Sequence, residues 1–185
     1  MCLVIDTNTF SSVFERKSLK HKEYKPVLDW ILNGKGMIVY GGKKYEEELK
    51  GKYRRIFMQF RNSNKIVEIP AHDVDNYEDY VKKHDLVKNS SFNDAHLVAI
   101  ISISRCKIIC TEDVEAKELV KEKKLYPKRF EIPKIYSNES HKELLCDKNI
   151  ANICQKHKKD KYGNKTEKLN KKDRNALDKV LDKSK

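Results

Sequence analysis

The chain has 185 residues, of which 38% are hydrophobic and 37% are charged. This length suffices for one domain with a real core plus an appendage, and the excess of charge indicates that part of the chain does not form core. The formal net charge of +12 favours contact with a polyanion such as nucleic acid, although a lysine-rich host proteome would give the same bias. The apolar runs are too short to span a bilayer, so we expect no membrane segment.

Short β-branched runs predict strands, and charged amphipathic segments between them predict helices. The strands are expected at 3–5, 37–40, 66–69 and 107–111. A weaker signal at 130–135 is interrupted by Pro133, which implies an edge strand or no strand. The helices are expected at 9–17, 26–33 (ended by Gly34 and Gly36), 43–61, 74–84, 93–105 and 113–124. This alternation predicts an α/β fold, with a parallel sheet of four or five strands and helices on both faces.

The chain divides into an α/β domain at 1–136 and a lysine-rich, helical or partly disordered C-terminal extension at 137–185. From Gln155 onward there are 12 Lys and Arg against 5 Asp and Glu, so this part carries +7 of the net charge. Such a tail is either loosely docked or an arm that binds phosphates. A zinc site at His141, Cys146, Cys154 and His157 is a weaker alternative, because the short Cys-x₂₋₄-Cys unit of structural zinc sites is missing.

The number and spacing of the cysteines indicate whether the protein belongs to an oxidising or a reducing compartment of the cell. The chain has five cysteines, at positions 2, 106, 110, 146 and 154. An odd number without a CxxC unit argues against a disulfide framework, and the spacing of Cys106 and Cys110 suggests that both face the core. The N-terminal sequence lacks the pattern of a signal peptide, so we expect a cytoplasmic protein.

Four carboxylates stand at the ends of otherwise apolar segments or beside them. Asp6 ends the run at 2–5, Asp94 opens the apolar helix, Asp113 follows the strand at 107–111, and Glu48 lies in the charged helix. In a parallel α/β protein, strand ends and helix starts meet at one edge of the sheet. Acidic groups gathered there would repel one another unless a cation lay between them, and oxygen ligands of this kind suit Mg²⁺ or Mn²⁺.

Each of these acids also has a purely structural explanation. Asp6 or Thr7 could cap the first helix, and the segment 91–94 matches the spacing of a capping box around Asp94. Asp113 could lie in the first turn of a helix that Thr111 caps. Glu48 is one of three consecutive glutamates, for which a solvated helix face is the usual explanation. His96 could contact RNA or a metal-bound water, but a histidine at such a position is more often a polar helix residue, so we leave it out of the catalytic set.

Taken together, the four acids and their settings resemble the PIN-domain ribonucleases, a family that includes toxin–antitoxin endonucleases and RNA-processing nucleases. The resemblance covers about residues 1 to 125 and rests on the segments Leu-Val-Ile-Asp-Thr-Asn at 3–8, Tyr-Glu-Glu-Glu-Leu at 45–49, Asn-Asp-Ala-His-Leu-Val-Ala at 93–99 and Cys-Thr-Glu-Asp at 110–113. It implies a three-layer α/β/α fold with the acids at the carboxyl edge of the sheet.

The resemblance also implies roles for individual residues. Asp6, Asp94, Asp113 and Glu48 would bind one or two Mg²⁺ or Mn²⁺ ions that activate water against an RNA phosphodiester. Asn8 and Thr111 would orient ligands or water. Two further acids are less certain ligands: Glu47, because the register of the glutamates is ambiguous, and Glu115, which stands where many members carry another acid.

The expected function is that of a metal-dependent endoribonuclease, a toxin or defence nuclease controlled by an inhibitory protein partner. Many PIN nucleases dimerise, so a homodimer is a further expectation from the resemblance. The alternative is a non-catalytic PIN-like module that holds RNA or a protein. A regulatory DNA binder is a third reading that rests on charge alone, since the sequence has no helix-turn-helix signal.

Overall fold

A central sheet of five parallel strands organises the structure, a computed structural model that describes residues 2–88, 92–156, 169 and 171–182. The strands are β1 (Cys2–Ile5), β2 (Met37–Gly41), β3 (Ile66–Ile69), β4 (Ile108–Cys110) and β5 (Lys134–Tyr136), in the spatial order β3-β2-β1-β4-β5. Leu3 lies beside Ile38, and Ile5 beside Cys110. β1 is therefore the middle strand, and its carboxyl end lies between those of β2 and β4.

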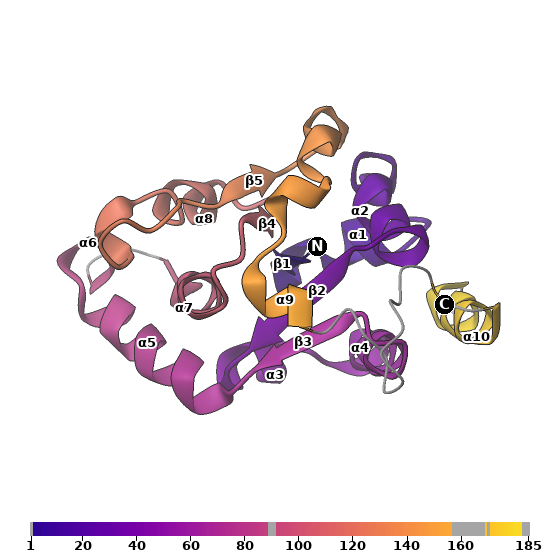
Figure 1. Ribbon diagram of the computed structural model, residues 1–185, viewed down its shortest axis with the longest axis horizontal. Coiled ribbons are helices and arrows are strands. Elements are labelled where there is room, and N and C mark those ends of the chain that lie inside the picture. Colours follow the sequence, from indigo (N-terminus) through magenta and orange to yellow (C-terminus); the bar gives the residue numbers. More distant parts are fainter. Residues whose placement is uncertain (1, 89–91, 157–168, 170, 183–185) are drawn as a thin grey trace.

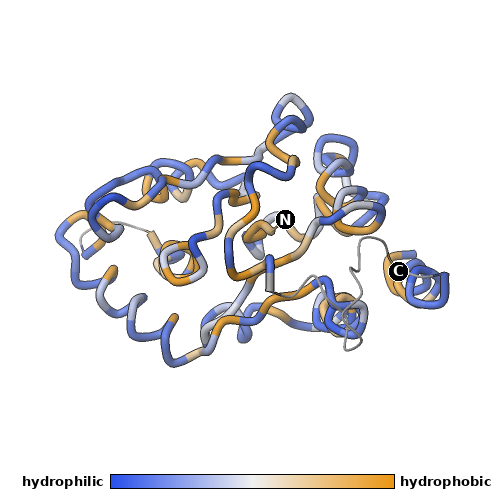
Figure 2. The backbone as a smooth tube through the Cα atoms, in the orientation of Figure 1, coloured by the Kyte–Doolittle hydropathy of each residue, from blue (hydrophilic) through white to orange (hydrophobic). Residues whose placement is uncertain are grey.

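The three inner strands are apolar throughout, as expected for strands buried on both faces. Every residue of β1, β2 and β4 is buried. β5 lies at the sheet edge, which agrees with the edge-strand alternative, but it begins only after Pro133 and not at residue 130, because proline cannot donate a ladder hydrogen bond. Figure 2 shows the apolar strands at the centre of the molecule and hydrophilic residues over the outward parts of the helices.

Helices cover both faces of the sheet, which confirms the predicted three-layer α/β/α architecture (Figure 1). The elements on one side are α5 (Ala71–Lys83), α6 (Asp85–Lys88), α7 (Ala95–Ser104) and α8 (Val114–Leu119); those on the other are α1 (Phe10–Phe14), α2 (His21–Asn33) and α4 (Gly51–Asn62). The remaining short elements are η1 (Thr7–Thr9), α3 (Lys43–Glu48), η2 (Lys123–Leu125), η3 (Glu139–Leu144), η4 (Asp147–Asn149) and α9 (Asn152–Lys156).

Several helices differ from the sequence prediction. Helices α1 and α8 end earlier than expected, at Phe14 and Leu119, and α6 was not predicted. The single helix expected at 43–61 is two helices, α3 and α4, separated at Leu49 and Lys50. Gly51 has φ +57°, a backbone conformation that most residues avoid, and it breaks the helix where the amphipathic pattern alone suggested continuity. Helix α2 begins five residues before the predicted start and contains Pro26, because the buried Tyr24 extends its apolar face toward the N-terminus.

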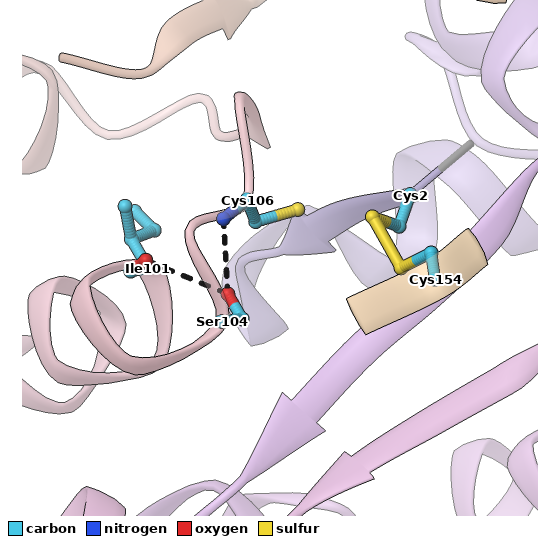
Figure 3. Close-up of a disulfide and its surroundings, with 5 residues drawn as sticks. All are labelled: Cys2, Ile101, Ser104, Cys106 and Cys154. Atoms are coloured by element: carbon cyan, nitrogen blue, oxygen red, sulfur yellow. Dashed lines mark hydrogen bonds between the residues drawn. A yellow bond between two sulfur atoms is a disulfide. The ribbon is translucent and has the colours of Figure 1, made fainter. Parts of the chain in front are cut away.

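A disulfide between Cys2 and Cys154 corrects the expectation drawn from the cysteine count (Figure 3). It joins β1 to α9 across 152 residues of chain, and both cysteines are fully buried. The bond also removes Cys154 from the zinc alternative, whose His157 lies outside the described residues. Cys106 and Cys110 are free and buried, as predicted, and burial raises the pKa of the Cys106 thiol to about 12.

The described part of the C-terminal extension docks on the domain. Helix α10 (Lys171–Asp182) packs against α4 and buries Leu177 and Leu181, while Arg16 forms ion pairs with Asp178 and Asp182. The helical spacing expected at 137–157 corresponds to short 3-10 turns followed by α9. The expectation of disorder at 157–168 falls outside the described residues. Within the described ranges, none of the helices combines the length and apolar character needed to cross a bilayer.

Candidate metal centre

The four predicted acids converge at the carboxyl edge of the sheet. Asp6 directly follows β1, Asp113 lies between β4 and α8, Glu48 ends α3, and Asp94 directly precedes α7. A cavity of about 280 Å³ opens at this edge. It is lined by Asn8, Lys44, Glu48, Phe92, Asn93, Asp94, Asp113 and Glu115. Three of the four acids thus line one cavity, and the charge of Asp6 acts on Asp94 from close by.

Asp6 is held in a fixed orientation by two hydrogen bonds. Its Oδ1 accepts from the backbone N–H of Asn8 at 3.0 Å, and its Oδ2 accepts from Oγ1 of Thr111 at 2.6 Å. The side chain is 1% exposed, and burial raises the pKa of the carboxyl group against the lowering effect of these two bonds. The negative charges of Asp113 and Glu48 raise this pKa further. Asp6 therefore caps η1, as one structural explanation proposed, and also belongs to the acidic cluster.

Glu48 is the glutamate of the 46–48 run that faces the site. Its Oε2 accepts a hydrogen bond from Oγ1 of Thr7 at 2.7 Å, and its Oε1 lies 3.1 Å from Nζ of Lys44. Glu46 and Glu47 are exposed and line a different cavity, beside Tyr40. Glu48 therefore lies among the acids, as the resemblance implied, whereas Glu47 lies outside the cluster.

Asp94 occupies the N-cap position of α7, but its side chain makes no capping hydrogen bond. The capping-box explanation therefore does not account for this carboxylate, and its expected partner Ser91 lies outside the described residues. Burial raises the pKa of Asp94 to about 6, with further contributions from the negative charges of Asp6, Glu48 and Asp113. The nearby ammonium of Lys44 opposes this rise. Asp94 therefore lies near enough to the three other acids for their charges to act on its carboxyl group.

Asp113 combines a structural role with a position at the cavity. Its Oδ1 caps α8 by accepting from the backbone N–H of Ala116 at 2.9 Å. Its own backbone N–H donates to Oγ1 of Thr111 at 3.1 Å, so Thr111 links Asp113 to Asp6. Glu115 is exposed and lines the same cavity, as does Asn8. The predicted supporting residues Asn8 and Thr111 both contact Asp6 directly.

His96, which the sequence analysis set aside, lies inside this cluster. The side chain is 1% exposed, and within the described part of the chain neither ring nitrogen has a hydrogen-bond partner. Its Nε2 is 3.6 Å from Oε2 of Glu48, and ligand atoms of Glu48, Asp94 and His96 all lie within 4.8 Å of one another. Burial lowers the pKa of His96 to about 4, against the opposing effect of Glu48.

The donor set fits a divalent cation. Bringing several carboxylates together in a partly buried site is unfavourable unless a positive charge compensates them. Burial, and then the neighbouring negative charges, raise the pKa of both Asp6 and Asp94. A buried imidazole without a hydrogen-bond partner is a second unfavourable feature that metal coordination would relieve. Carboxylate oxygens are the ligands that Mg²⁺ and Mn²⁺ prefer.

Comparison of the chain with family models, with curated proteins and with solved structures gave no match. The interpretation of the site therefore depends on its own geometry and chemistry.

Proposed function

We propose that this protein is a metal-dependent endoribonuclease whose centre is formed by Asp6, Glu48, Asp94 and Asp113. The observation that carries the proposal is the convergence of these four acids, from four separate parts of the chain, at the carboxyl edge of a parallel sheet. That edge is where open α/β folds bind their ligands. Capping accounts for part of the roles of Asp6 and Asp113, but it does not account for Asp94, whose side chain makes no capping bond.

Each acid has a distinct part in the proposed site. Asp94 offers a carboxylate that makes no capping bond, and Glu48 has one oxygen held by Thr7. Asp6 is fixed by Thr111 and therefore presents its remaining lone pairs in a defined direction. A bound Mg²⁺ or Mn²⁺ would activate water for attack on phosphorus and stabilise the charge that develops on the leaving 3′-oxygen. Asn8, exposed at the rim, would contact the substrate or an ordered water.

RNA as the substrate is supported by charge. The chain carries a net charge of +12 although its proposed centre is acidic. A basic surface gathers the phosphates of a polyanion, while metal ions neutralise the carboxylates that would otherwise repel it. Lys44, in the first turn of α3, supplies a cation that lines the cavity of the centre itself.

A second candidate function is a non-catalytic module that holds RNA or a protein, and one observation favours it. Lys44 lines the acidic cavity, and its ammonium lies 3.1 Å from Glu48, where it compensates part of the negative charge without any metal. The two functions differ in what Lys44 does. In a nuclease, Lys44→Met would strengthen metal binding by removing a competing cation, whereas in a metal-free module it would only weaken the interaction with RNA.

The wider role proposed for the nuclease is that of a toxin or defence enzyme in the cytoplasm, held in check by an inhibitory protein and able to form a homodimer. The toxin or defence role, the inhibitory partner and the homodimer are supported by the resemblance alone. The cytoplasmic location carries a testable consequence, because disulfides are rare in a reducing cytosol. It requires that Cys2 and Cys154 be thiols in the cell, which alkylation of freshly lysed cells followed by mass spectrometry would detect.

The test of the nuclease is the cleavage of an end-labelled RNA pool with Mg²⁺, with Mn²⁺ and with EDTA. Asp94→Asn nearly preserves size and removes one charge, and the matched control Asp79→Asn changes an exposed acid on α5. The nuclease predicts metal-dependent cleavage by the wild type and by Asp79→Asn, and none by Asp94→Asn. RNA that is retained by all three proteins and cut by none would favour the binding module.

A further inference from the structure

The buried imidazole of His96 has no hydrogen-bond partner in the described part of the chain, and it is directed at two carboxylates. His96 is the second residue of α7, a helix that is otherwise almost entirely apolar and buried. Leaving a buried polar group without a partner costs about 1–3 kcal/mol. A leucine in this position would pack without that cost. Packing alone therefore does not explain an imidazole here.

The surroundings of His96 supply ligands rather than hydrogen bonds. Its Nε2 faces Oε2 of Glu48 at 3.6 Å, too long for a hydrogen bond. On another side, the ring of Tyr45 meets the imidazole edge-on with its centroid 6.1 Å away. The hydroxyl of Tyr45 is directed away, because it donates to the backbone carbonyl of Ile5 at 2.6 Å. Tyr45 thus packs against the imidazole and leaves its nitrogen facing the carboxylates.

The spacing of these groups suits coordination of one ion. Ligand atoms of Glu48, Asp94 and His96 lie within 4.8 Å of one another. Around an octahedral ion with ligands at about 2.1 Å, adjacent ligands are about 3.0 Å apart and opposite ones about 4.2 Å apart. The three groups therefore need only a small inward movement to share an ion. The Asp94 side chain is free for this movement, since it makes no capping bond.

We propose that His96 joins Glu48 and Asp94 as a nitrogen ligand and makes this a mixed nitrogen–oxygen site that binds a divalent transition-metal ion, such as Mn²⁺, in preference to Mg²⁺. The proposal deepens the nuclease function and rests on it, because it names the metal that the same centre takes. The physical reason is ligand chemistry. Imidazole binds first-row transition-metal ions more readily than it binds Mg²⁺, which prefers oxygen donors and its own water shell. Mn²⁺ is the member of that series that also suits carboxylate oxygens.

The test uses Mn²⁺ alone as the probe, with the full-length protein freed of metal by chelation. Pulsed electron paramagnetic resonance of bound Mn²⁺ detects a coordinated imidazole through its ¹⁴N modulation. Titration calorimetry with Mn²⁺ and with Mg²⁺ gives the two affinities. The wild type is expected to show ¹⁴N modulation and to bind Mn²⁺ at least about tenfold more tightly than Mg²⁺.

Two variants and a control sharpen the result. His96→Leu removes the nitrogen, and His96→Gln replaces it with an amide in case the leucine variant does not fold; the control His72→Gln changes an exposed histidine on α5. In either folded His96 variant, the ¹⁴N signal should disappear and Mn²⁺ affinity should fall about 10- to 100-fold, while Mg²⁺ affinity changes little. His72→Gln should behave as the wild type.

The outcomes separate this proposal from the nuclease. The role of His96 is overturned if the wild-type protein binds Mn²⁺ without ¹⁴N modulation, or if it does not bind Mn²⁺ at all. The nuclease function would still stand in that case if RNA were cleaved equally well with Mg²⁺. ¹⁴N modulation that disappears in the His96 variants supports the mixed site even if every RNA remains intact. If ¹⁴N modulation is present but no RNA is cut, the metal site is supported and the nuclease function is contradicted.

Discussion

Thr111 donates a hydrogen bond from Oγ1 to Oδ2 of Asp6 over 2.6 Å, between residues 105 positions apart in the chain. Both side chains are buried, and the bond links the ends of the neighbouring strands β1 and β4. The same Oγ1 accepts from the backbone N–H of Asp113. One hydroxyl therefore sets the relative positions of two of the four acids.

Replacing Thr111 with valine keeps the shape of the side chain and removes both of these hydrogen bonds. We expect Thr111→Val to lower the free energy of unfolding by about 1–3 kcal/mol, because a buried carboxylate oxygen loses its donor. Mn²⁺ affinity should fall about 10- to 100-fold, as for other residues that orient a ligand. Denaturant unfolding and calorimetric titration measure the two effects. Unchanged Mn²⁺ affinity would mean that Thr111 does not position Asp6 for a metal.

The two glutamates Glu47 and Glu48 provide a matched pair of substitutions. Glu48 contacts Thr7 and Lys44 in the acidic cavity, whereas its neighbour Glu47 is exposed and lines a different cavity. Glu48→Gln should therefore lower Mn²⁺ affinity at least about tenfold, and Glu47→Gln should leave it unchanged. Titration of both variants at the same ionic strength makes the comparison. Equal losses would indicate a general charge effect rather than a specific ligand.

The metal-free protein should lose stability with rising pH through Asp94. Its pKa is raised from 3.8 to about 6, so over this range the folded protein retains a proton that the unfolded chain has released. The contribution of Asp94 to the free energy of unfolding therefore falls between about pH 4 and pH 6 and is constant above. The pKa of His96 is lowered to about 4, so its contribution to the free energy of unfolding rises with pH over an overlapping pH range.

The variant Asp94→Asn isolates this effect, because His96 is present in both proteins. The free energy of unfolding of the wild type minus that of Asp94→Asn should decrease from pH 4 to pH 6 and then level off. Urea unfolding in EDTA at several pH values measures the difference. A difference that does not depend on pH would show that Asp94 has an ordinary pKa.

The Cys2–Cys154 disulfide should stabilise the oxidised protein. Because it closes a loop with a sequence separation of 152 residues, the chain-entropy model gives an upper value of about 5 kcal/mol. Cys154→Ser, Cys2→Ser and the double variant should all lose a similar amount, since each removes the same bond. The half-buried Cys146 is free, so Cys146→Ser serves as the control. Unfolding midpoints that do not respond to a reductant would contradict this prediction.

The sequence predicted most of the sheet because its signal is local. The runs at β1, β2 and β4 are apolar enough to require burial on both faces, and Pro133 limited β5 to an edge strand or no strand. The same locality explains the error at 43–61, where the amphipathic pattern continues through a glycine that adopts a positive φ. The Cys2–Cys154 bond joins residues 152 positions apart, and nothing in the local sequence indicates that they meet.

The acids of the site were found because strand ends and helix starts have a known position in a parallel α/β fold. Sequence could not decide among Glu46, Glu47 and Glu48, since the break after α3 sets which of them faces inward. His96 was missed because its significance lies in the absence of a hydrogen-bond partner within the described structure. The available signal was an imidazole two residues after Asp94 on an otherwise apolar helix.

The central claim is that the converging acids form a metal-dependent nuclease, and one measurement tests it most directly. An end-labelled RNA pool is incubated with wild type or with Asp6→Asn, each with Mn²⁺ and with EDTA, after both proteins are shown to be folded. The account predicts cleavage only by the wild type and only with Mn²⁺. Cleavage by Asp6→Asn at the wild-type rate, or intact RNA in every reaction, would contradict it.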